Sequence, residues 1–516
     1  MKNIAIVGGG TAGWVTALYA KKMYPNENIT LIQSPEIGIL GAGEGSTPRL
    51  LNLFSFLDIP LEELIKKTKS TIKVGIKFSN WSKDKDSYFH NFLNSNIFFS
   101  DYLTDESVDF FKLPLLPYEK FLDIQNKSQP LILNKILNNG DIPFSIDITK
   151  NAENKMDKIL SYSFYSIHFD AKLLANFLSE IGISRGIQLI EDDVVKIETN
   201  ENNDIVGLIL KNKKNILTDF VFDCSGFSRL IIGKHYNSKW KSFSEFLPMK
   251  KALPFFIEMD EDSIPAYTEA IAMDYGWMWK IPLQHRYGCG YVFDSDYIDE
   301  DQAKEEIEKF LGFKPSYPRE TKGAFSFSPG CFEEVWINNC LAVGLSSAFV
   351  EPLEATSLGQ TVDLLQKIFT NRHLIFSNNK KEKKLFNKNY LNTTEEIVDF
   401  LCLHYVTNKD NSEFWKNFNK KNKKSKKLIN YLKLGKNFNL KYSTFIHDEY
   451  FTLENYYEII FGNKIFNKKY LTKIKKEYLE TNNLNYFNDK ILHKNNVSKN
   501  FISHKYFLKF MGGLND

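Results

Sequence analysis

The chain begins with two short apolar runs separated by a stretch of helical periodicity. Ile4–Val7 forms the first run and Ile29–Ile32 the second, and apolar residues recur three or four positions apart between residues 17 and 23. Short continuous apolar runs favour buried strands, whereas that spacing favours a helix. The pattern therefore predicts a strand–helix–strand unit at the N-terminus.

The turn between the first strand and the helix is rich in glycine and has the spacing G-x-G-x-x-G. In such a turn the first glycine permits a tight bend, the second lets a pyrophosphate approach the backbone, and the third lets the helix pack on the strand. The N–H groups at the start of the helix then face the phosphates. The sequence thus predicts a dinucleotide site whose contacts include Gly8, Gly10, Thr11, Ala12 and Gly13.

The second strand ends at Gln33, where an acidic residue usually holds the ribose of a dinucleotide. Gln33 can still hydrogen-bond a hydroxyl, and Glu36 lies close by as a substitute. A glycine-rich loop follows at residues 41–48, which alone would be an ordinary surface loop. Beside a nucleotide-binding turn it becomes a candidate for close backbone approach to the same cofactor. Its predicted contacts are Gly41, Ala42, Gly43 and Glu44.

Two later apolar runs also lead directly into small or polar residues. Phe220–Phe222 runs into Asp-Cys-Ser-Gly, and Leu341–Val343 runs into a glycine. A buried strand that stops at such residues indicates a further place where the chain meets a ligand. The predicted contacts there are Asp223, Gly226 and Gly344.

Residues 71–78 alternate strictly between apolar and other positions. The alternation predicts one strand with Ile72 and Val74 on its apolar face and Lys73 and Lys77 on the opposite face. From alternation alone both lysines are expected to be solvated. After residue 350 a turn leads into a predicted helix, for which Thr356 or Ser357 is the expected N-cap.

Beyond about residue 375 the chain becomes rich in Lys and Asn, with charged helical stretches and aromatic clusters. We predict an α/β, Rossmann-like module over residues 1–375 and a mainly helical C-terminal part over residues 376–516, on the substrate side.

Composition narrows the functional classes. The 66 Lys and Arg residues nearly balance 63 Asp and Glu residues, so there is no electrostatic case for nucleic acid or for an anionic membrane. The five cysteines are scattered, which favours a reduced, cytoplasmic location. The nine histidines show no metal-binding spacing, so no metal is expected. No apolar run reaches the roughly 20 residues of a membrane span.

Several stretches together resemble the flavin-dependent halogenases of the tryptophan halogenase type. They are GGGTAGW at Gly8–Trp14, GAGEGSTP at Gly41–Pro48, TIKVGIKFSNW at Thr71–Trp81, DCSGFSRLII at Asp223–Ile232, WMWKIP at Trp277–Pro282, VEPLEATSL at Val350–Leu358 and LHYVTNKDNSEFW at Leu403–Trp415. The resemblance runs from residue 1 to about residue 465. The W-x-W-x-I-P stretch is the most specific, because it separates these halogenases from flavin hydroxylases.

The resemblance implies FAD as the cofactor and assigns the catalytic pair. The family's catalytic lysine corresponds to Lys73 and its catalytic glutamate to Glu354. Reduced FAD, oxygen and a halide ion would give hypohalous acid, which travels down a tunnel to Lys73. Lys73 would hold it by hydrogen bonding or as a haloamine, and Glu354 would orient the reagent and stabilise the cationic ring intermediate. Lys73 would then face a tunnel instead of water, and Lys77 the solvent.

The resemblance also places the halide and the wall between flavin and substrate. The halide is expected at Thr356 and Ser357, where backbone N–H groups begin a helix. Trp277, Trp279 and Pro282 are expected to keep the organic substrate away from the flavin, although both tryptophans would lie on one strand face as core residues too.

The sequence departs from the family in three places. Ala355 stands where Ser is common and Ser357 where Gly is common, and Asn455–Glu458 does not reproduce the residues that hold the amino and carboxylate groups of free tryptophan. We therefore expect a small aromatic substrate of the indole, phenol or pyrrole type without assigning free tryptophan.

No second dinucleotide turn is present, so a separate flavin reductase is expected to supply reduced FAD. Two alternatives stay open, a flavin-dependent aromatic hydroxylase and an inactive flavin-binding protein. The sequence leaves the halide preference open, and also whether the chain forms a homo-oligomer.

Overall fold

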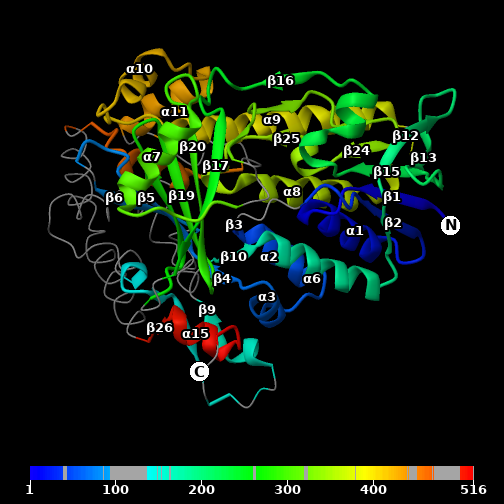
Figure 1. The fold of residues 1–516 in the computed structure, drawn as a ribbon, viewed down its shortest axis with the longest axis horizontal. Helices are drawn as coiled ribbons and strands as arrows, with labels where there is room; N and C mark the ends of the chain where they lie inside the picture. The colour runs from blue at the N-terminus through cyan, green and yellow to red at the C-terminus, as the bar shows by residue number, and fades with distance from the viewer. Residues whose placement is uncertain are drawn as a thin grey trace, which may run out of the picture.

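The computed structural model describes most of the chain. Described are residues 1–38, 43–92 except 85, 136–161 except 148, 151 and 153, 164–259, 263–318, 323–377, 379–437, 440, 450–467, 469 and 500–514. The elements belong to two large sheets, several small ones and the helices around them (Figure 1).

The first large sheet is the predicted Rossmann-like unit. Its order is β11 (Gln188–Glu191), β2 (Asn28–Gln33), β1 (Asn3–Val7), β15 (Phe220–Asp223), β24 (Cys340–Ala342) and β23 (Trp336–Ile337). The first five strands are parallel, and β23 is antiparallel to β24. Helices α1 (Thr11–Met23) and α6 (Ala171–Ser184) lie side by side next to it (Figure 1). The carboxyl ends of β2, β1 and β15 meet at one edge, where Val7 pairs with Ile32 and with Asp223.

The second large sheet has seven strands and contains the WMWKIP stretch. Its order is β21 (Phe325–Ser326), β17 (Lys251–Glu258), β20 (Arg286–Phe293), β19 (Gly276–Pro282), β18 (Tyr267–Ala272), β5 (Gly75–Ser79) and β6 (Ser87–Asn91). The pairings are antiparallel except that of β18 with β5. Both tryptophans of β19 are buried.

The strand predicted over residues 71–78 is wrong in one respect, because it is broken at Val74. β4 (Thr71–Lys73) belongs to a three-stranded sheet with β3 (Gly43–Gly45) and β10 (Ser166–Asp170), whereas β5 belongs to the seven-stranded sheet. Val74 bridges the two sheets: its N–H donates to Ala266 O at 2.8 Å, and its carbonyl accepts from Phe92 N at 2.9 Å. Lys73 and Lys77 therefore lie in different surroundings.

Four small sheets complete the strands. They are β7 (Asp141–Ile142) with β26 (Ile502–Ser503), β8 (Phe144–Ile146) with β9 (Ile159–Ser161), the set β12 (Val194–Thr199), β13 (Ile205–Leu210) and β14 (Asn215–Leu217), and the set β16 (Trp240–Ser242), β22 (Gly330–Phe332) and β25 (Ala348–Phe349). The pairing of β26 with β7 brings the C-terminal residues back to the first third of the chain (Figure 1).

The described residues after position 375 are mainly helical, as predicted. They form α9 (Lys380–His404), α10 (Glu413–Lys421), α11 (Lys426–Lys436), α12 (Leu453–Gly462) and α15 (His504–Phe510). Earlier helices are α2 (Pro48–Phe56), α3 (Leu61–Lys67), α7 (Glu300–Leu311) and α8 (Thr356–Thr370). The N-cap of α8 is Ala355, not the predicted Thr356 or Ser357, and no side chain caps this end.

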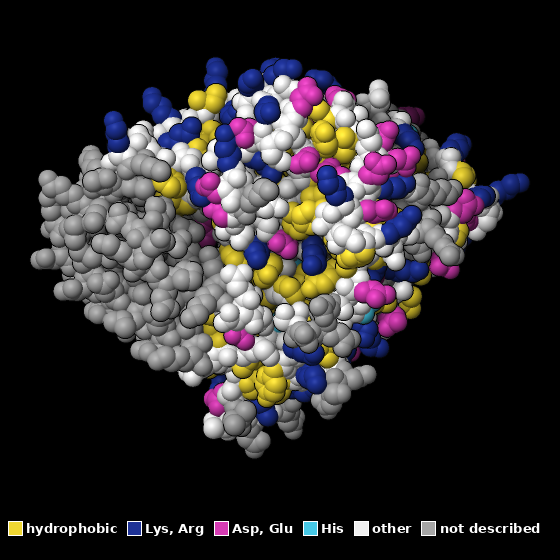
Figure 2. Space-filling model, turned by 60° about the vertical axis from the view of Figure 1, so that its left-hand side comes forward, with side chains coloured by type: hydrophobic (Ala, Val, Ile, Leu, Met, Phe, Trp, Pro, Cys, Tyr) yellow, Lys and Arg dark blue, Asp and Glu magenta, His cyan; other side chains and the backbone are white. Residues whose placement is uncertain are grey.

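One continuous apolar core joins these parts, since it contains Ile4 of β1, Leu353 before α8, Leu403 of α9 and Met511 after α15. The five cysteines are all buried and free. None of the described helices is both long and apolar enough to cross a membrane. Basic and acidic side chains are interspersed over the described part of the face in Figure 2, in agreement with the balanced composition.

Candidate functional site

The glycine turn after β1 leaves room for a ligand at one position only. Gly8 has φ +125°, and a Cβ there would lie 2.1 Å from the carbonyl oxygen of Cys224. A Cβ at Gly13 would lie 1.9 Å from the carbonyl oxygen of Gly8. Gly10, by contrast, is the N-cap of α1, and a Cβ there would meet nothing within 4 Å. The turn therefore forms a cradle at Gly10, in front of the N–H groups of Thr11 and Ala12.

The other two predicted strand ends converge on this turn. Val343 N donates to Asp223 O at 2.9 Å, and a Cβ at Gly344 would lie 2.8 Å from that of Ala12. Gly226 has φ +65° and faces open space. The Asp223 carboxylate is fully used within its own turn, where it accepts from the N–H groups of Ser225, Ile231 and Ile232. Asp223 thus shapes the turn with both of its oxygens.

The remaining predicted cofactor contacts lie at the edges of this cradle. A Cβ on Gly9 would lie 2.0 Å from Gln33 Oε1, so the Gln33 side chain lies against the turn. Glu36 instead binds Lys211 at 2.9 Å among exposed side chains. Burial, and secondarily the charge of Asp170, raises the pKa of Glu44 to about 7. Gly43 belongs to β3, and Gly41 and Ala42 lie outside the described residues.

Lys73 is fully buried at the end of β4. Its Nζ has no hydrogen-bond partner in the described structure and lies 5.2 Å from the ring centroid of Phe92. A Cβ on Gly45 would approach Nζ to 3.0 Å, so the glycine of the GAGEGSTP stretch leaves space for the amine. Burial lowers the pKa of Lys73 to about 8, and the negative charge of Glu354 partly offsets this effect. Lys77 is only partly buried, and its Nζ lies 3.4 Å from Asn138 Oδ1.

A chain of hydrogen bonds ties the strand of Lys73 to Pro282 of the WMWKIP stretch. The Thr71 hydroxyl donates to Pro282 O at 2.7 Å and therefore accepts from His168 Nδ1 at 2.9 Å. His168 Nε2 then accepts from the Thr268 hydroxyl at 3.0 Å. Burial, followed by the charges of Lys73 and His504, lowers the pKa of His168 well below its usual value. His168 is thus a neutral link between three strands.

Glu354 lies in the 3-10 turn η6 (Pro352–Glu354) and is held by two histidines. His90 Nδ1 lies 2.9 and 3.0 Å from its two oxygens, and His404 Nε2 lies 2.7 Å from Oε1. Burial acts to raise the pKa of Glu354, but the charge of His90 and hydrogen bonds from His404 and His90 outweigh it and lower the pKa to about 2. Glu354 is therefore a buried carboxylate.

Neither histidine is predicted from the sequence. His90 lies near the end of β6, and His404 lies in the LHYVTNKDNSEFW stretch, which carries the family resemblance without indicating a role for this histidine. No local sequence pattern marks either residue, and their common role follows from their hydrogen bonds to Glu354.

His90, Glu354 and His404 form the one group of described residues that could hold a metal ion, with ligand atoms within 4.8 Å of one another. Ligands bonded to Zn²⁺ at about 2.1 Å in a tetrahedral site lie about 3.4 Å apart. The nitrogen–oxygen distances of 2.7 and 2.9 Å are those of hydrogen bonds instead. The arrangement needs no metal, and its absence remains a prediction.

Trp277 and Trp279 lie with their ring centroids 6.2 Å apart. Trp277 Nε1 donates to Glu351 Oε2 at 3.3 Å, and the Tyr405 hydroxyl donates to the same oxygen at 2.6 Å. Burial raises the pKa of Glu351 to about 7, against the effect of these two donors. Trp277 is thus joined to the turn that also carries Glu354.

The N-terminus of α8 follows Glu354 directly. Ala355 has φ +52° and ψ +35°, a left-handed conformation that turns the chain sharply between the carboxylate and the helix. Thr356 is buried, and its hydroxyl has no partner among the described residues, whereas Ser357 is partly buried. Buried N–H groups and a hydroxyl without a partner suit an anion.

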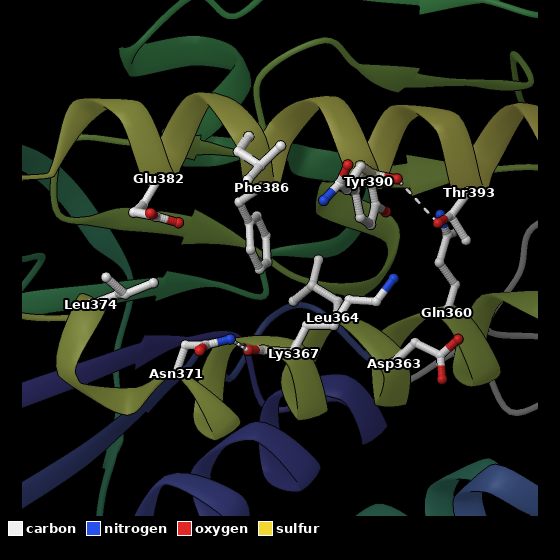
Figure 3. A pocket seen from close by; sticks show the side chains of 12 residues that line it. Gln360, Asp363, Leu364, Lys367, Asn371, Leu374, Glu382, Phe386, Tyr390 and Thr393 are labelled. Atoms are coloured by element: carbon white, nitrogen blue, oxygen red, sulfur yellow. Dashed lines mark hydrogen bonds between the residues drawn. The ribbon is translucent and has the colours of Figure 1, made fainter. Parts of the chain in front are cut away.

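A separate groove of about 260 Å³ lies between α8 and α9 (Figure 3). Leu364 and Phe386 line its apolar part, and Asp363, Lys367 and Glu382 line its polar part. It contains none of the predicted site residues, so we do not assign the catalytic chemistry to it.

A Rossmann-like sheet with a glycine turn, a buried lysine and a buried carboxylate agrees with the class of flavin-dependent halogenases. The chain belongs to the tryptophan halogenase family, whose model matches residues 3–477. It is 30% identical over 431 residues to 7-chloro-L-tryptophan 6-halogenase of Kutzneria, covering 80% of this chain and 81% of that protein. It is 29% identical over 430 residues to tryptophan 6-halogenase of Streptomyces toxytricini, covering 80% of each.

Solved structures agree with this assignment. A flavin-dependent halogenase from Xanthomonas campestris is 25% identical, with a TM-score of 0.80 over 98% of both chains. A tryptophan halogenase from Shewanella frigidimarina is also 25% identical, with a TM-score of 0.83 over 99% of this chain and 97% of that one. The predicted fold class and enzyme class are thereby confirmed.

Proposed function

We propose that this chain uses reduced FAD, oxygen and a halide ion to halogenate an electron-rich aromatic ring. The observation that carries the proposal is the buried amine of Lys73, which has no partner among the described residues and feels the charge of the Glu354 carboxylate. An unpaired buried ammonium is costly, so its retention favours a role toward a ligand.

The glycine turn fits FAD because the cradle at Gly10 has room for a pyrophosphate. The residues that would hold FAD are Gly8–Gly13, Gln33, Glu44, Gly226 and Gly344, with residues 41–43 as further candidates and Asp223 shaping the turn. Bound reduced FAD would supply hypohalous acid from oxygen and the halide, and a separate reductase would supply the reduced flavin.

Lys73 would hold the hypohalous acid by donating a hydrogen bond to its oxygen. When the ring carbon takes the halogen, the oxygen–halogen bond breaks and the departing hydroxyl takes a proton from Nζ to leave as water. Glu354 would accept the proton that the ring releases, so that ring and hypohalous acid become halogenated ring and water. A donor and a carboxylate facing each other in a dry site suit this step.

Trp277, Trp279 and Pro282 would separate the flavin from the ring to be halogenated. Support comes from the hydrogen bond of Trp277 to Glu351, three residues before Glu354, and from the chain that joins Pro282 to the strand of Lys73. The halide would bind at the N–H groups of Thr356 and Ser357, beside the Thr356 hydroxyl.

The substrate would be a small aromatic of the indole, phenol or pyrrole type. Asn455 and Glu458 are engaged by the protein: Asn455 Nδ2 contacts His90 Nε2 at 2.8 Å, and Glu458 Oε2 accepts from Asn91 N at 3.1 Å. This gives no support for free tryptophan over another ring.

The test supplies a flavin reductase, oxygen and chloride, bromide or iodide in turn, and screens an aromatic panel by mass spectrometry. The expected product carries the supplied halogen, and hydroxylated product without halide would contradict the proposal. Lys73→Met should abolish halogenation while flavin reoxidation continues, and Lys77→Met should be mild. Wild-type rates in Lys73→Met, or loss of activity only in Lys77→Met, would reject the assignment.

A further inference from the structure

We infer that His404 is a positioning residue. The proton shared by His404 and Glu354 resides on His404, so that Glu354 meets the substrate as an anion fixed in one orientation. The inference rests on the proposed function and adds a residue to it. His404 is fully buried and is the last residue of α9.

The two ring nitrogens of His404 both face acceptors. Nδ1 lies 2.9 Å from the carbonyl oxygen of Phe400, which only accepts, so Nδ1 carries a hydrogen. Nε2 lies 2.7 Å from Glu354 Oε1, and a second proton must lie between these two atoms. Either His404 is an imidazolium facing a carboxylate, or it is neutral and faces a carboxylic acid.

The surroundings favour the imidazolium. His404 stands at the C-terminal end of a 25-residue helix, where the helix dipole favours a cation. The rings of Phe78 and Phe400 lie with centroids 4.9 and 5.0 Å from its ring, and aromatic rings attract cations. The contacts with His90 and His404 outweigh burial and lower the pKa of the Glu354 carboxyl to about 2, which favours the carboxylate.

His90 supplies the second contact to Glu354 through Nδ1. Asn455 Oδ1 accepts from Thr452 N at 2.8 Å, so its amide nitrogen faces His90 Nε2 at 2.8 Å and donates to it. Nε2 is then an acceptor, and the hydrogen of Nδ1 points to Glu354. Burial acts to lower the pKa of His90, while Glu354 and Glu458 more than offset it and raise it.

The two histidines engage the carboxylate unequally. Oε1 has contacts with both, whereas Oε2 has, among the described residues, a single contact of 3.0 Å with His90. Oε2 therefore retains lone pairs for the ring proton. Without His404, the buried carboxylate would lose a cation and a hydrogen bond, its pKa would rise, and at moderately acidic pH it would already be protonated.

The ionisable groups that act on this pair come from several elements. They are Lys73 of β4, Tyr88 and His90 of β6, Glu458 of α12 and Tyr450. All remain in place in a His404 variant, so a changed pH profile reports on His404 itself.

The activity test compares His404→Leu, His404→Gln and wild type by the halogenated product formed per hypohalous acid generated, from pH 5 to 8. Leu removes the donor, and the expected loss is about 10- to 100-fold, the worth of one hydrogen bond to a charged group. The acid limb, meaning the fall of this yield toward low pH, should also move to higher pH. Gln keeps an N–H at the ε position and should recover part of the yield, but with the same acid shift.

His373 lies exposed in the turn after α8, and His373→Leu is the matched control that should change nothing. A pure folding defect would lower flavin binding and hypohalous acid formation together, without changing the product formed per hypohalous acid or its dependence on pH. If His404→Leu keeps the wild-type yield per hypohalous acid and the wild-type acid limb, the inference is wrong.

A second measurement needs no substrate. Nitrogen NMR of protein labelled in histidine should show a histidine with both ring nitrogens protonated at pH 7 whose signal is absent from His404→Gln. Glu354→Gln should convert it to a singly protonated ring. A neutral His404 in the wild type would overturn the inference, whereas a wild type that halogenates nothing on the panel would overturn only the proposed function.

Discussion

At the scale of single residues, Lys73 carries an electrostatic cost that the rest of the site does not remove. Burial lowers its pKa from 10.5 to about 8, with Glu354 acting in the opposite direction. Because the folded-state pKa lies below the unfolded value, the unfolded chain binds more protons between these two values. The charged amine therefore destabilises the fold at neutral pH, and this cost shrinks as the pH rises from about 8 toward 10.5.

Replacing Lys73 with Met should stabilise the protein while it abolishes halogenation. The fall of the Lys73 pKa from 10.5 to about 8 corresponds to roughly 3 kcal/mol at pH 7, a figure that already includes the opposing effect of Glu354. Urea unfolding at pH 7 and pH 10 measures the gain, which should be smaller at pH 10. Lys77→Met serves as the control, and a destabilised Lys73→Met protein at pH 7 would contradict the argument.

The sequence pattern singles out Lys73 but does not predict that its side chain is buried. Alternation shows which side of a strand a residue occupies, but it does not show what covers that side. Both lysine side chains are therefore expected to be solvated from the pattern alone. The resemblance corrects this for Lys73. His90 and His404 are single histidines that lie 264 and 50 positions from Glu354, and no local pattern links residues so far apart.

At the scale of elements, β4 is an edge strand, and a histidine side chain accepts a hydrogen bond from its free edge. β10 pairs with one edge, and on the other edge Ile72 N donates to His504 Nε2 at 2.9 Å. His504 Nδ1 donates to Ile264 O at 3.0 Å, so the ring must be neutral. His504 thus takes the place of a neighbouring strand for the residue before Lys73.

His504→Leu should loosen β4, so that more hypohalous acid escapes to a scavenger for each flavin oxidised. His504→Gln keeps an acceptor at the ε position and should restore much of the retention. Burial lowers the pKa of His504 to about 4. Since this is below the unfolded value of 6.5, the unfolded chain binds the extra proton, and stability should fall as the pH drops from about 6.5 toward 4.

Thermal unfolding between pH 4 and pH 7 checks this slope, which should be weaker in both variants because neither has the imidazole. Equal scavenger yields in His504→Leu and wild type would show that β4 holds Lys73 without this contact.

Most elements that carry the site follow from local patterns, and the exceptions have a tertiary cause. The predicted strands before Gly8 and Asp223 and the first helix are present, because apolar runs and glycine turns act over a few residues. The break at Val74 depends instead on a distant partner, Ala266. The N-cap of α8 is Ala355 in a left-handed conformation, which costs about 1 kcal/mol or more for an L-residue and which no sequence rule would place there.

At the scale of the whole molecule, one core supports two chemically distinct places. The glycine turn and the strand ends at Asp223 and Gly344 make the proposed cofactor side. Lys73, Glu354 and the two histidines make the proposed reaction side, which includes His404 from beyond the boundary predicted at residue 375. That boundary remains a prediction, and the reaction side needs residues from both of its halves.

A substitution at Gly10 should remove cofactor binding without disturbing the fold or the proposed reaction side. Its Cβ would meet nothing within 4 Å, and φ is −75°, which any L-residue adopts, so Val at this position leaves the fold unstrained. The side chain would instead occupy the cradle in front of α1 and exclude a pyrophosphate. Gly10→Val should therefore keep the wild-type melting temperature without flavin.

The same variant should lose the increase in melting temperature that FAD gives the wild type, because a ligand stabilises only the state that binds it. Gly8→Ala is the informative contrast, since its Cβ would lie 2.1 Å from Cys224 O and should destabilise the fold with or without FAD. Flavin fluorescence and melting curves with and without FAD measure both effects. Undiminished FAD affinity in a folded Gly10→Val protein would mean that the cofactor does not lie over this turn.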